Sequence, residues 1–108
     1  GAARTDLFAK SGKEQLATIL TGLGSLSYGE LAGERMKLGV LLHDPEEEHD
    51  CFSDNTHNSH YYDQVGMMSI WSGEFKGGKA QKFPGIADLA RAQAPDAAKR
   101  VDDAMAVT

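Results

Sequence analysis

The sequence contains little cysteine, proline or tryptophan: one cysteine, three prolines and one tryptophan in 108 residues. A lone cysteine cannot form a disulfide within the chain, so the cysteine content assigns no redox compartment. Three readings of Cys51 remain open. It is a small buried apolar side chain, which we favour, or the disulfide partner of a cysteine in another segment, or a catalytic thiol, which is the most remote of the three.

The sequence also lacks an excess of basic residues and any long apolar run. Its 11 Lys and Arg residues are outnumbered by 16 Asp and Glu residues, which gives a formal net charge of −5. Nucleic-acid phosphates require a basic surface, so a nucleic-acid partner is not expected. No run approaches the roughly 20 apolar residues that span a bilayer, and we therefore expect no membrane-spanning segment here.

The remaining composition is that of a globular protein. Hydrophobic residues make up 41% and charged residues 25% of the chain, as in ordinary folded domains. Apolar residues recur every three or four positions, and no alternating pattern typical of strands is present. The sequence predicts an all-α helical bundle, in which residues 1–108 form a single helical domain or a domain fragment.

Four helices are expected, over residues 12–43, 57–71, 86–93 and 95–107, with a polar loop over residues 44–56. The first helix begins with a capping box, in which Ser11 is the N-cap and Glu14 lies three residues later. It ends before Pro45, because proline disfavours helical geometry in the preceding residue. Its glycines leave two alternatives, one long helix or two helices separated near residues 22–29, and we favour one long helix.

The length of this first helix has a consequence. Thirty helical residues extend about 45 Å, whereas a compact domain of this size has a diameter of only about 35 Å. A helix of that length would overhang its own domain. We therefore expect the chain to be part of a larger protein.

The first helix carries two acids where apolar residues are expected. Counting 3.6 residues per turn from Leu16 places Glu30 and Glu34 on the stripe that should face the core. Like charges four residues apart repel, and a buried carboxylate needs a metal, a cation or a shared proton as its partner. One prediction is that Glu34 points inward, toward a polar pocket shared with Asp54 or His57. The alternative, of equal weight, is that the helix kinks at its glycines and both acids face solvent.

The polar loop and its flanks supply side chains that bind metals. Imidazole and carboxylate groups suit iron, zinc or copper. No H-E-x-x-H, C-x-x-C or EF-hand spacing is present, so the metal signal is weak and no catalytic residue is assigned. The candidate metal ligands are Glu34, His49, Asp54 and His57, and the candidate ligand-binding residues are Glu30, Arg35, Ser53 and Asn55.

Each of these loop residues also has a structural explanation. For His49 a solvated loop position is favoured over metal binding. For Asp54 and Asn55, helix capping and turn formation have the same weight as a ligand role. Residues 46–48 form an exposed acidic turn in this view, and Phe52 anchors the loop to the core. Arg35 directly follows Glu34 in the helix and cannot share its face, so we expect it to bind an anion elsewhere.

Four motifs together resemble the imelysin-like family of bacterial envelope proteins, which includes iron-regulated protein A. The motifs are Gly33-Glu34-Arg35-Met36, the stretch Glu48-His49-Asp50-Cys51-Phe52-Ser53-Asp54-Asn55-Thr56-His57, Gly66-Met67-Met68 and Gly73-Glu74-Phe75-Lys76-Gly77. They are similar to the later half of the family sequence over roughly residues 15–80. The resemblance implies a mostly helical protein of two bundle-like halves with a functional site between them, so the remaining half is an expected partner.

The resemblance also implies a location and three functional hypotheses. Family members are exported to the periplasm or the cell surface, often as lipoproteins, and are linked to iron uptake. The first hypothesis is therefore an envelope protein that binds iron, another divalent metal or a metal-bearing ligand. The second is a metallopeptidase, which is less favoured because the chain lacks zinc-protease spacing. The third is a helical interaction module without a metal site. The family signature Gly-x-His-x-x-Glu is absent from this chain, so none of its roles is transferred.

Overall fold

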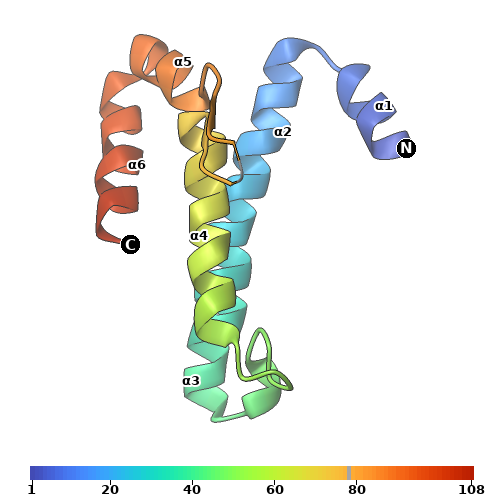
Figure 1. Cartoon of the computed structure of the whole chain (residues 1–108), viewed down its shortest axis with the longest axis vertical. Coiled ribbons are helices and arrows are strands. Elements are labelled where there is room, and N and C mark those ends of the chain that lie inside the picture. Colours follow the sequence, from blue (N-terminus) through green and yellow to red (C-terminus); the bar gives the residue numbers. More distant parts are fainter. Residues whose placement is uncertain (78) are drawn as a thin grey trace. The chain divides into compact units, whose positions relative to one another are not determined.

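A computed structural model describes residues 1–77 and 79–108 and confirms a mostly helical protein (Figure 1). The chain divides into two compact units, Gly1–Thr56 and His57–Thr108. The elements in chain order are α1 (Ala2–Phe8), α2 (Gly12–Gly24), the π-helix η1 (Ser25–Leu38), α3 (Gly39–Leu42), the 3₁₀ turn η2 (Pro45–Glu47), α4 (Thr56–Ser72), β1 (Glu74–Phe75), β2 (Gln81–Lys82), α5 (Ile86–Gln93) and α6 (Pro95–Val107).

The first unit is dominated by one long helical segment. Elements α2, η1 and α3 follow one another without a break from Gly12 to Leu42, so the glycines do not divide the segment. The expected capping box is confirmed: the Glu14 N–H donates to Ser11 Oγ at 3.4 Å, and the Ser11 N–H donates to the Glu14 carboxylate at 2.9 Å. The segment ends at His43, whose backbone is left-handed with φ 53°. Helix α1 was not predicted.

The middle of this segment is a π-helix of 14 residues, Ser25–Leu38. In a π-helix each N–H bonds the carbonyl five residues earlier, and most examples are single turns. The wider turn shifts the side chains out of the 3.6-residue stripe that was counted from Leu16. Leu31 is the buried residue of this element, whereas Glu34 is exposed. The prediction that Glu34 points inward is therefore wrong, because it assumed α-helical geometry.

The second unit packs α5 and α6 around the C-terminal end of α4. Its core consists of Trp71, Ala87 and Ala98, with Val101 and Met105 partly buried against them. The two alanines are each 1% exposed and Trp71 is 6% exposed. Alanine side chains let the helices approach closely, so this small core is filled mainly by one indole ring.

A short antiparallel hairpin connects α4 to α5. Glu74 pairs with Lys82 and Phe75 with Gln81. The sequence showed no strand here, because strands of two residues are too short to produce an alternating pattern. Of the helices in the described residues, none is long and apolar enough to cross a membrane.

Two glycines allow the backbone to close at the base of this hairpin. Gly73 has φ +73°, and a Cβ on it would lie 2.3 Å from the carbonyl oxygen of Phe83. A Cβ on Gly85 would lie 2.5 Å from the carbonyl of Ser72. The Phe83 N–H donates to the Gly73 carbonyl at 2.9 Å. Only glycine fits where the chain leaving α4 contacts the chain entering α5.

Candidate functional site

The best-defined polar pair of the first unit lies on the π-helix. Arg35 Nε donates to Glu30 Oε1 at 2.9 Å, and both side chains are about one-third exposed. On an α-helix, residues five apart point about 140° away from each other. On a π-helix they share a face, because the turn closes over five residues. The π geometry is therefore what lets Glu30 orient Arg35, and Glu30 is the anion that Arg35 binds.

Further carboxylates surround this guanidinium. The hydrogen bond from Arg35 to Glu30 is the main cause that raises the pKa of Arg35, and the charge of Glu30 adds to it. The negative charges of Glu34, on the same helix, and of Glu47, on η2, raise it further. The long helix and the following turn thus place one permanent cation among three carboxylates.

The polar loop that follows η2 is closed by Thr56. Its hydroxyl donates to Glu48 Oε2 at 3.2 Å and accepts the Asp50 N–H at 3.2 Å. His49 Nδ1 lies 3.7 Å from a carboxylate oxygen of Asp50. Thr56 is the first residue of α4, so these bonds fix the loop to the start of that helix. The stretch from Glu48 to Thr56 is an ordered turn that gathers acids and an imidazole.

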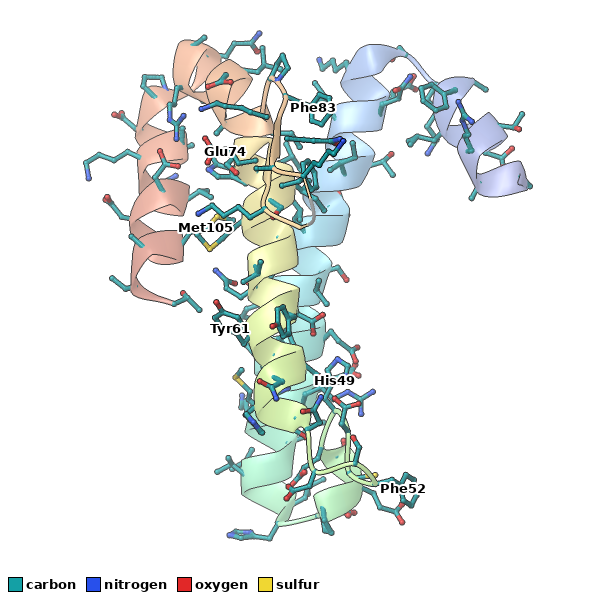
Figure 2. All side chains as sticks on the ribbon, viewed as in Figure 1. His49, Phe52, Tyr61, Glu74, Phe83 and Met105 are labelled. Atoms are coloured by element: carbon teal, nitrogen blue, oxygen red, sulfur yellow. The ribbon has the colours of Figure 1, made fainter. Side chains whose placement is uncertain are left out.

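The other candidates lie at the tip of this loop. The N–H groups of Ser53 and Asp54 both donate to the Asp50 carbonyl at 3.1 Å, and Asp54 has a left-handed backbone with φ 51°. Asn55 is exposed, as are Ser53 and Asp54. Phe52 is 101% exposed, and its ring points away from the ribbon (Figure 2). The prediction that Phe52 anchors the loop is wrong, because polar bonds to the backbone hold the loop instead.

The four candidate metal ligands do not form a coordination group in the described chain. Glu34, His49 and Asp54 belong to the first unit, and His57 begins the second. Throughout residues 1–77 and 79–108, no three His, Cys, Asp or Glu side chains lie close enough to hold a metal ion. The donor types suit iron or zinc. Their role as metal ligands remains a prediction.

Sequence reasoning missed a polar network in the second unit. The Trp71 Nε1–H donates to Asp102 Oδ1 at 2.8 Å, and Arg91 donates to the same carboxylate at 3.0 and 3.1 Å. The hydrogen bond from Trp71, followed by that from Arg91, lowers the pKa of Asp102. One carboxylate thus joins α4, α5 and α6. A buried indole N–H usually requires a partner, which was the only signal in the sequence.

Comparison with known families gives one match over the whole chain. The family model described as imelysin, peptidase family M75, matches residues 1–108. Searches of curated proteins and of solved structures found no match. The match includes the motifs around Arg35 and the polar loop, and the mostly helical fold agrees with it. This chain therefore belongs to the imelysin family.

Proposed function

We propose that this imelysin-family protein works outside the cytoplasm, at the periplasm or cell surface, and binds iron, another metal or a metal-bearing ligand during uptake. The observation that carries the proposal is the Glu30–Arg35 pair on the π-helix, with the charges of Glu34 and Glu47 beside it. π-Helical segments are frequent at functional sites.

In this proposal the residues divide the work of binding. Glu30 holds Arg35 through Nε, so that the planar guanidinium is oriented before a ligand arrives. Guanidinium groups recognise carboxylate and phosphate groups of ligands through paired N–H donors. The carboxylate of Glu34 supplies an oxygen donor of the kind that metal ions accept. Because the described residues do not gather three metal donors, the remaining donors come from the ligand or from the rest of the protein.

The test is titration calorimetry of the full-length protein with iron, zinc and copper salts and with ferric citrate. Glu34→Gln keeps the shape of the side chain and removes its charge. We expect binding to weaken by about tenfold, equivalent to about 1.4 kcal/mol. Thermal stability should be unchanged, because Glu34 is exposed. Glu46→Gln, on the exposed acidic turn, is the matched control. Equal affinity in wild type and Glu34→Gln would remove this residue from the site.

The description of the matched family as a peptidase favours a second candidate, a metallopeptidase. Such an enzyme requires a metal with an open coordination position and a general base. Cleavage of a mixed peptide library by the full-length protein, abolished by a chelator and restored by added metal, would support this candidate. Metal binding without cleavage would support uptake. The absence of both would favour the interaction module.

A further inference from the structure

The hairpin between α4 and α5 concentrates positive charge and exposed aromatic rings. Lys76, Lys79 and Lys82 lie in a stretch of seven residues that contains no acid. The chain as a whole has a net charge of −5. Phe75 and Phe83 flank these lysines and are 42% and 53% exposed. We call these five residues the hairpin surface; Figure 2 labels Phe83 and the neighbouring Glu74.

The described parts of this surface are held in place by several contacts. The two rings meet edge to face, with centroids 6.3 Å apart. Lys82 Nζ lies 2.7 Å from Glu74 Oε1, which pairs the two strands across the hairpin. The backbone contact of Gly73 with Phe83 fixes the base. The aromatic rings are thus oriented by the fold, although the small core of the second unit does not cover them.

Exposed phenylalanine beside lysine has a specific chemical use. Aromatic and apolar side chains enter the boundary between headgroups and acyl chains, while lysine extends its amine toward phosphate groups. An acidic protein is repelled by an anionic surface except where it presents basic residues. We propose that the hairpin surface docks the protein on an anionic phospholipid membrane. This inference does not depend on the metal-binding proposal, because it concerns a different unit and a different ligand.

The experiment measures cosedimentation of the full-length protein, expressed without lipid modification, with vesicles. One set contains phosphatidylglycerol and phosphatidylcholine, and the other contains phosphatidylcholine alone. The double variant Lys76→Gln/Lys79→Gln removes two cations and leaves the ion pair between Lys82 and Glu74 in place. Each lysine near an anionic surface contributes about fivefold to binding, so the double variant should bind about 25-fold more weakly. Lys13→Gln/Lys37→Gln, also exposed, is the control with the same change in charge.

Binding to anionic vesicles that is weakened by the hairpin variant and retained by the control supports the proposal. Equal binding to both vesicle types, or equal loss in both double variants, overturns it. Loss of vesicle binding on addition of millimolar glycerol phosphate would identify a free phosphate ligand and would also overturn it. The Trp71 fluorescence of the hairpin variant must match that of the wild type, which shows that weaker binding is not caused by unfolding.

Discussion

The contact at Gly73 predicts that Gly73→Ala destabilises the second unit strongly. Gly73 is buried, has φ +73°, and a Cβ on it would lie 2.3 Å from the Phe83 carbonyl oxygen. No side chain is available to move out of the way, because the atom it would meet belongs to the backbone. The substitution must therefore displace either the end of α4 or the segment that leads into α5.

The magnitude follows from two costs. A non-glycine residue in the left-handed region costs about 1–2 kcal/mol. Forcing extra atoms into a closed contact adds about 1–3 kcal/mol. The free energy of unfolding should therefore fall by about 2–5 kcal/mol, a large part of the stability of a small domain.

The control is the same substitution at Gly66, in the middle of α4. Apart from the backbone of α4 itself, no atom lies within 4 Å of a Cβ built there. Alanine is also favoured over glycine in a helix by about 0.5–1 kcal/mol. Gly66→Ala should therefore leave stability unchanged or raise it. Urea denaturation followed by Trp71 fluorescence measures both variants. If Gly73→Ala unfolds at the same urea concentration as the wild type, the backbone contact described here is wrong.

Three further changes have defined outcomes. Ser11→Ala removes the N-cap of the long helical segment and should cost about 1 kcal/mol, seen as faster amide exchange in the first turn of α2. The lowered pKa of Asp102 means that its carboxylate stabilises the second unit above its ordinary pKa of 3.8, and that this contribution disappears as the pH falls through the lower folded-state value. Asp102→Asn should therefore lower the free energy of unfolding at neutral pH and make it depend less on pH in the acid range, as measured by urea unfolding at several pH values. An unchanged pH dependence would contradict the network. The hydrogen bond and charge of Lys82 lower the pKa of Glu74. Lys82→Gln should therefore raise the pKa of Glu74, as measured by NMR titration of its carboxyl group.

The long helical segment was predictable because its signals are local. Ser11 and Glu14 are three residues apart, and the capping box depends only on that spacing. The end of the segment before Pro45 depends on one peptide unit. The family was also predictable, because its motifs are short stretches of consecutive residues that can be recognised without knowledge of the fold.

The candidate site was predictable only in part. The sequence pointed to Glu30, Glu34 and Arg35 as candidate site residues. The prediction of where the Glu34 side chain points assumed 3.6 residues per turn, whereas the hydrogen-bonding pattern changes at Ser25. The partner of Arg35 is Glu30 because of that change. The network on Asp102 joins residues 31 positions apart, and no local pattern indicates which of several aspartates meets the indole.

The π-helix gives the chain a place where its length can vary. Removing one residue between Ser25 and Leu38 lets the neighbouring N–H groups return to carbonyls four residues back, so the segment stays helical. An alignment gap within this segment in a related sequence would therefore mark a change of helix type, with the helix and the loop after it preserved. A deletion between Glu30 and Arg35 would leave these residues four apart, a spacing at which the side chains of an α-helix also meet.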